Sequence, residues 1–213
     1  VIFADADLRR AAVSAAASGF GNAGQSCSAR SRILVQRSVA REFLELFGAA
    51  ATKLRVGAAM DPETSLGPLI SEQHRSGVAA SVDAAVAAGA RLAHGGSAVA
   101  GAGFFFEPTI LDDVLPSNPA FSHEIFGPVC SITTFDTEAE GIQLVNDSQY
   151  GLNGSVWSAD IGRALRVARA MRTGMVAVNG LPSASKTSIF APFGGYKQSG
   201  IGRELGLEAL GFY

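Results

Sequence analysis

Short apolar runs alternate with segments of helical periodicity along this chain, and that alternation limits the possible folds more than any other feature. The runs have the length of strands and are rich in β-branched and aromatic residues. They cover Ile33–Gln36, Phe104–Leu111, Val129–Phe135, Gly154–Trp157 and Met175–Asn179. Such alternation is typical of an α/β fold, here a mainly parallel open sheet flanked by helices.

Four helices are predicted around these strands. The first lies near Asp7–Ser18, and the second begins at a possible N-cap, Ser38. An alanine-rich helix ends at Gly89, and a fourth helix, with an apolar stripe from Ile161 to Met171, ends at Gly174. Because no repeat or linker interrupts the pattern, we expect a single domain over residues 1–213.

Charge and composition exclude several classes of protein. The net charge is −2 and the basic residues form no stripe, so neither nucleic acid nor an anionic membrane surface is an expected partner. No apolar run approaches the roughly 20 residues that a spanning helix needs, and the first residues lack a signal-like segment. Two cysteines do not make a disulfide framework, which favours a cytoplasmic protein.

Cys27 lies in a glycine-containing segment, Phe20–Ala29, between the first helix and the first strand. The glycines allow a sharp bend, and the small neighbours Ser26 and Ser28 leave room for a substrate carbonyl beside the sulfur. A free cysteine more often simply packs in a core, as we expect for Cys130 in the run Val129–Phe135. From the residues alone, both a catalytic and a packing role stay open for Cys27. Because Cys27 follows the end of a helix, that helix dipole does not lower its pKa.

Five stretches in order resemble the NAD(P)-dependent aldehyde dehydrogenase family. They are Phe3–Leu8, Asn22–Cys27 (N-x-G-Q-x-C), Glu124–Val129 (E-x-F-G-P-V), Asn146–Leu152 (N-x-x-x-Y-G-L) and Pro192–Gly200 (P-F-G-G-x-K-x-S-G). The resemblance runs from end to end and implies the catalytic domain of that family.

The resemblance implies a role for three residues. Cys27 would be the nucleophile, adding to an aldehyde to form a thiohemiacetal, with its own backbone amide donating to the oxyanion. Hydride transfer to NAD or NADP would leave a thioester for water or coenzyme A. Glu124 would accept hydrogen bonds from the nicotinamide ribose, and Phe126 would pack beside that ribose and ring. The resemblance also implies an aldehyde substrate and a homo-oligomeric full-length protein.

Some positions depart from the family pattern or carry no clear signature. His74 occupies a position where many members have a cofactor-contacting glutamine. For His74, His94 and His123 we expect solvated or capping roles, since none has a metal-ligand partner at useful spacing. The turn Phe193–Gly195 is expected to position Asn179, and 181–191 to line the substrate entrance.

The family's general-base glutamate, second oxyanion donor and Rossmann-like cofactor domain are expected upstream of Val1, and a final strand after Tyr213. We therefore predict a catalytic-domain fragment that is inactive alone. Two alternatives remain: a non-catalytic folded remnant or partner-binding domain, and a cysteine acyl-transferase or esterase, which would need His74, His94 or His123 as its base.

Overall fold

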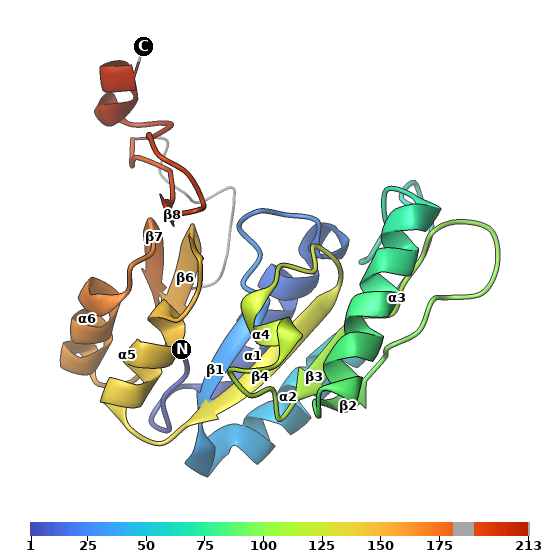
Figure 1. The fold of residues 1–213 in the computed structure, drawn as a ribbon, viewed down its shortest axis with the longest axis horizontal. Coiled ribbons are helices and arrows are strands. Elements are labelled where there is room, and N and C mark those ends of the chain that lie inside the picture. Colours follow the sequence, from blue (N-terminus) through green and yellow to red (C-terminus); the bar gives the residue numbers. More distant parts are fainter. Residues whose placement is uncertain (181–189, 213) are drawn as a thin grey trace.

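The main sheet is four-stranded, and three of its strands run parallel. The computed structural model describes residues 1–180 and 190–212. The strand order is β1 (Arg32–Gln36), β4 (Val129–Phe135), β3 (Thr109–Asp112) and β2 (Arg91–His94). Only β2, at the edge, is antiparallel to its neighbour. The predicted α/β fold with a mainly parallel sheet is confirmed (Figure 1).

The first residues of the chain join this sheet to a second one. Strands β6 (Asn153–Val156) and β7 (Met175–Val178) pair in parallel. Ile2 forms bridges to Val35 at the end of β1 and to Trp157 just after β6. Its N–H donates to the carbonyl of Leu34 at 2.8 Å, and its flanking residues are buried. Residues 1–3 therefore lie between the two sheets as a central connecting strand, which the sequence analysis did not predict.

Helices cover both faces of the main sheet (Figure 1). Helices α1 (Leu8–Phe20) and α2 (Ala40–Thr52) pack together on one face, where Phe47 stacks on both Phe20 and Phe43. Helices α3 (Glu72–Ala87) and α4 (Pro119–Ser122) cover the other face. Helices α5 (Glu138–Asn146) and α6 (Ile161–Ala170) lie beside the smaller sheet. None of the helices within the described residues is both long and apolar enough to span a bilayer.

Three predicted boundaries were wrong. Ser38 is not an N-cap, because a 3-10 turn over Arg37–Val39 precedes α2 and Val39 caps it without a side-chain bond. The run from Phe104 enters β3 only at Thr109, since Pro108 has no N–H to donate to a ladder.

The helix expected to reach Gly174 stops at Ala170. The cause is the side chain of Asn146, which donates to the carbonyl of Ala170 and accepts from the N–H of Arg172. This asparagine satisfies the helix C-terminus that would otherwise be left without partners.

The C-terminal part of the chain extends away from both sheets (Figure 1). It begins with a short antiparallel pair, β5 (Tyr150–Gly151) with β8 (Tyr196–Lys197), and ends in a 3-10 helix over Leu207–Phe212. Lys197 ties the pair to the body by donating from Nζ to the carbonyls of Asn146 and Ser148.

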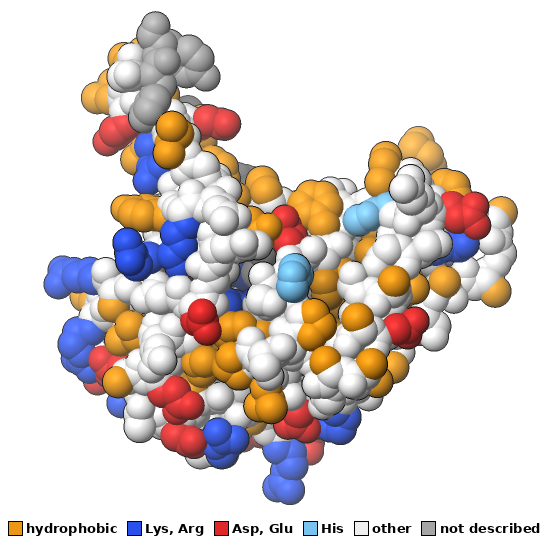
Figure 2. Space-filling model, in the orientation of Figure 1, with side chains coloured by type: hydrophobic (Ala, Val, Ile, Leu, Met, Phe, Trp, Pro, Cys, Tyr) orange, Lys and Arg blue, Asp and Glu red, His pale blue; other side chains and the backbone are white. Residues whose placement is uncertain are grey.

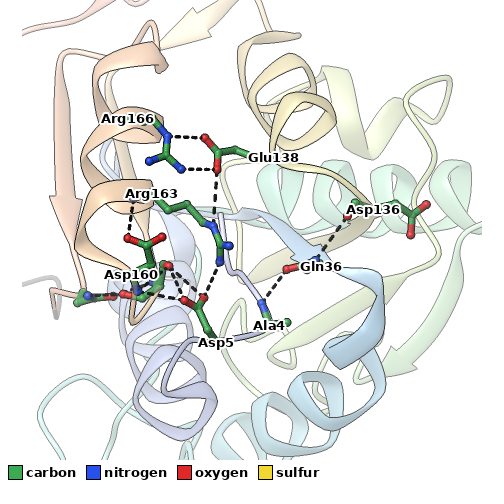
Figure 3. Close-up of polar contacts among 10 residues, drawn as sticks. Ala4, Asp5, Gln36, Asp136, Glu138, Asp160, Arg163 and Arg166 are labelled. Carbon is green, nitrogen blue, oxygen red and sulfur yellow. Dashed lines mark hydrogen bonds and ion pairs between the residues drawn. The ribbon is translucent and has the colours of Figure 1, made fainter.

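Asp5 connects the central connecting strand to α6 (Figure 3). Its carboxylate accepts from the hydroxyl of Ser158 and the N–H of Asp160, and it pairs with Arg163 at 3.1 Å. Burial alone would raise the pKa of Asp5, but the Asp160 N–H, the Ser158 hydroxyl and Arg163 together lower it below its usual value. The charged form is therefore the stabilising one.

Replacing Asp5 should destabilise the fold in a pH-dependent way. We expect Asp5→Ala to lower the free energy of unfolding by about 1–3 kcal/mol at pH 7, because several donors lose a charged acceptor. Since the folded pKa lies below the ordinary 3.8, this contribution is present above that pH and is lost as the pH falls through the folded value. Urea unfolding at pH 7 and pH 3 checks both statements. Asp83→Ala, at an exposed site on α3, is the control, and an equal loss in the two variants would contradict the assignment.

Candidate active site

The loop that carries Cys27 is shaped by three consecutive left-handed residues. After α1 ends, Asn22, Ala23 and Gly24 have φ values of 53°, 53° and 70°. The side chain of Asn22 donates to the carbonyl of Gln25 at 2.8 Å, which stabilises the reversal. Cys27 then lies inside a tight turn closed by the bond from the Ala29 N–H to the Ser26 carbonyl, and it is exposed. The sulfur therefore stands on a short, tightly bent loop.

This loop packs backbone against backbone on the segment 124–128. A Cβ atom added to Gly24 would overlap the carbonyl of Gly127, so only glycine allows the two chains to approach this closely. The contact brings together two of the stretches that the sequence analysis singled out, Asn22–Cys27 and Glu124–Val129.

Cys27 and Glu124 line one cleft of about 370 Å³. Residues of α1, of β1 and of the stretch 150–155 also line it. Figure 2 shows this face of the molecule, with the C-terminal segment rising on one side and α3 on the other. Both side chains are exposed, so the sulfur and the carboxylate are open to a ligand in the cleft.

Phe126 lies two residues beyond Glu124 and beside α3. Its backbone has a φ of 55°, which is uncommon for an aromatic residue, and its side chain is 40% exposed. The ring lies near the ring of His74, with the centroids 6.4 Å apart, and His74 Nε2 is 2.8 Å from the Phe126 carbonyl oxygen. The sequence analysis expected a solvated or capping role for His74 and did not anticipate that bond.

Two guanidinium groups, those of Arg30 and Arg32, also line the cleft. Arg32 donates to the carbonyls of Asp147 and Val145 and lies over the ring of Phe121. Arg30 donates to Asn153 at 3.2 Å, while its Nε and Nη1 are buried without a partner among the described residues. Burial lowers the pKa of both arginines.

The second cysteine has a different environment. Cys130 lies on β4, is fully buried, and its sulfur fills the space above Gly19. Burial raises its pKa far above the usual value, so the thiolate is strongly disfavoured. The predicted core role of Cys130 is confirmed.

The three histidines lie apart. His123 lines the cleft with Cys27 and Glu124, and its Nδ1 is close to the Ser122 hydroxyl and the Pro119 carbonyl. His74 contacts Phe126, and His94 lies on the edge strand β2. Within residues 1–180 and 190–212, no group of three or more His, Cys, Asp or Glu side chains could hold a metal ion.

Two further expectations concern the C-terminal loops. Asn179 is held by Ser158 through both of its side-chain atoms, whereas the turn Phe193–Gly195 places the Gly194 carbonyl against Gly174. The structure thus gives Asn179 a different anchor from the expected one. The expected substrate entrance, 181–191, lies almost wholly outside the described residues.

A model of the aldehyde dehydrogenase family matches residues 1–213. The chain belongs to that family. Aldehyde dehydrogenase relatives cover the whole chain, among them the succinate-semialdehyde dehydrogenase of Paenarthrobacter nicotinovorans at 47% identity and the betaine aldehyde dehydrogenase of Bacillus subtilis at 42%. The chain spans 47% and 44% of their respective lengths.

Solved aldehyde dehydrogenases have the same fold. The betaine aldehyde dehydrogenase of Staphylococcus aureus in complex with NAD⁺ is 44% identical, with a TM-score of 0.94 over the whole chain and 42% of that structure. A point mutant of it was solved with NAD⁺ and a BME-modified cysteine. An NAD-dependent aldehyde dehydrogenase from Sinorhizobium meliloti is 38% identical, with a TM-score of 0.96 over the whole chain and 42% of that structure.

Proposed function

We propose that this chain carries the nucleophile of an NAD(P)-dependent aldehyde dehydrogenase and that the nucleophile is Cys27. The observation that carries the proposal is the exposed sulfur on a tightly bent loop, open to the cleft that Glu124 also lines. Membership of the family supports it, as does the modified cysteine in the Staphylococcus aureus structure. The buried Cys130 offers no competing thiol at the surface.

The chemistry begins with the Cys27 thiolate. Its sulfur forms a bond to the aldehyde carbon, and the carbonyl oxygen becomes an oxyanion to which the Cys27 backbone N–H would donate. Bound NAD or NADP supplies the hydride acceptor that converts this adduct into a thioester. Attack by water then breaks the C–S bond, releases a carboxylic acid and returns the thiol, and coenzyme A would instead give an acyl-coenzyme A.

Glu124 and Phe126 fit the role of holding the cofactor. An exposed carboxylate at the cleft is a suitable acceptor for two ribose hydroxyls, because each of its oxygens accepts hydrogen bonds. A partly exposed aromatic side chain two residues away can provide an apolar wall for a flat ring. The rest of the cofactor site would come from the part of the enzyme that this chain does not cover.

Complementation in trans tests the proposal. The 213-residue chain alone should give no steady NAD(P)H with an aldehyde and NAD(P). Adding the part of a relative that this chain does not match should restore NADH formation, followed at 340 nm, with the wild-type chain and with Cys130→Ser. Restored activity with Cys27→Ser, or steady turnover by the chain alone, would overturn the proposal. No rescue by the wild-type chain would favour a non-catalytic remnant.

A cysteine esterase or acyl-transferase is the second candidate, because His123 lines the same cleft as Cys27. If His123 were the base, His123→Gln would abolish hydrolysis of an activated ester such as p-nitrophenyl acetate. The dehydrogenase proposal expects little change in that variant. The dehydrogenase proposal also holds that the whole enzyme is homo-oligomeric. It places that enzyme in the cytoplasm, in keeping with the two free cysteines of this chain.

A further inference from the structure

The Cys27 loop and Phe126 are joined by a closed ring of contacts that passes through α3. On one side of the ring, Gln25 reaches the segment before α3: its Oε1 accepts from the N–H of Ile70 at 2.9 Å, and its Nε2 lies 3.4 Å from the carbonyl of Pro68. Ser71 then caps α3 by accepting from the N–H of His74. This series of bonds connects the loop that carries the nucleophile to the first turn of α3.

The other side of the ring returns from α3 to the loop. His74 contacts the Phe126 carbonyl through Nε2. Gly127, which follows Phe126, lies against both Val78 of α3 and Gly24 of the Cys27 loop. No Cβ would fit at Gly127 without moving Val78. The segment 124–128 is therefore held between α3 and the Cys27 loop, and the side chain of His74 makes the polar contact between this segment and α3.

The geometry fixes the direction of the His74 bond. A carbonyl oxygen can only accept, so Nε2 must carry the hydrogen at 2.8 Å from the Phe126 oxygen. That bond holds the carbonyl of a residue whose φ of 55° costs free energy for a side chain of this size. The bond and the glycine contacts together keep Phe126 in this conformation.

We propose that His74 is a positioning residue, which holds the backbone of Phe126 and, through the closed ring of contacts, fixes that aromatic side chain relative to the Cys27 loop. The inference rests on the proposed function, since Phe126 matters to catalysis only if it packs beside the cofactor. The inference gives the side chain of His74 a hydrogen bond to another residue of the protein, at the Phe126 carbonyl.

The first test is spectroscopic and uses the wild-type chain. Nitrogen-15 NMR of the histidine rings reports which nitrogen carries the hydrogen in the neutral form. We expect the Nε2–H tautomer for His74. The Nδ1–H tautomer would leave two acceptors facing each other and would overturn the proposal. This measurement needs no enzymatic activity, so its outcome is separate from that of the complementation test.

The second test compares variants by hydrogen exchange. His74→Leu should accelerate exchange of the amides in residues 124–127 about three- to tenfold, while amides of β1 and β4 keep their rates. His74→Gln can still donate from its amide and should restore most of the protection. His94→Leu, on the edge strand, is the matched control and should leave residues 124–127 unchanged. Unchanged exchange in His74→Leu, or equal acceleration in His74→Gln, would contradict the proposal.

Discussion

In the folded chain, Cys27 should react with iodoacetamide at least about a thousandfold faster than Cys130. Cys27 is exposed on a turn, whereas Cys130 is fully buried on the central strand β4. Burial also raises the pKa of Cys130, so even a molecule of reagent that reached it would meet a thiol and not a thiolate. The reaction of Cys130 therefore needs local opening of the sheet.

Mass spectrometry of peptides after timed labelling measures the two rates. In urea, where the burial of Cys130 is lost, the rates should converge. Equal labelling in the folded protein, or faster labelling of Cys130, would contradict the assignment of Cys27 as the accessible thiol.

The second large effect is expected at Gly24. Gly24→Ala should lower the free energy of unfolding by about 3 kcal/mol or more, because the new Cβ would overlap the Gly127 carbonyl and the residue must keep a positive φ. The two backbones would have to separate, which would move the Cys27 loop away from the segment of Glu124. We therefore also expect complementation in trans to be lost, even at temperatures where the variant is folded.

Gly21→Ala is the matched control in the same loop. Gly21 has a φ of −53° and no atom within 4 Å of an added Cβ, so its replacement should change stability by less than about 1 kcal/mol. Urea unfolding of both variants makes the comparison. Similar losses at the two positions would show that the approach of Gly24 to Gly127 is not what shapes the loop.

Local patterns predicted the strands with the strongest apolar signal. Strand β4 was placed at Val129–Phe135, as observed, and β1 within one residue. Both are buried strands of a parallel sheet, whose apolar runs are continuous. The edge strand β2 was missed because it is short and partly exposed, and α5 was missed because Gly141 is its only fully buried residue.

Long-range pairing was beyond the reach of these patterns. Residues 1–3 carry an apolar sequence that gives no sign of its partners. Yet Ile2 pairs with Val35 and Trp157, which lie 33 and 155 residues further along the chain. The end of α6 depended in the same way on Asn146, which lies in a different helix.

The sequence predicted the residues at the centre of the candidate site, but not the tertiary contacts that hold them in place. The motif around Cys27 and the stretch from Glu124 to Val129 were both selected from sequence, and the structure brings Cys27 and Glu124 into one cleft. The approach of Gly24 to Gly127 and the bonds of Gln25 and His74 were not predicted, because each depends on tertiary contacts. A histidine in place of the family's glutamine was the one signal that pointed to position 74.

The most direct measurement of the central claim is the mass of the peptide that contains Cys27 during turnover. The complemented enzyme is supplied with an aldehyde and NAD(P), quenched in acid within the first turnovers, digested and analysed by mass spectrometry. We predict an added acyl group on Cys27, absent when NAD(P) is omitted, and no such group on Cys130. An acyl group on another residue, or undiminished turnover by Cys27→Ser without one, would contradict the claim that Cys27 is the nucleophile.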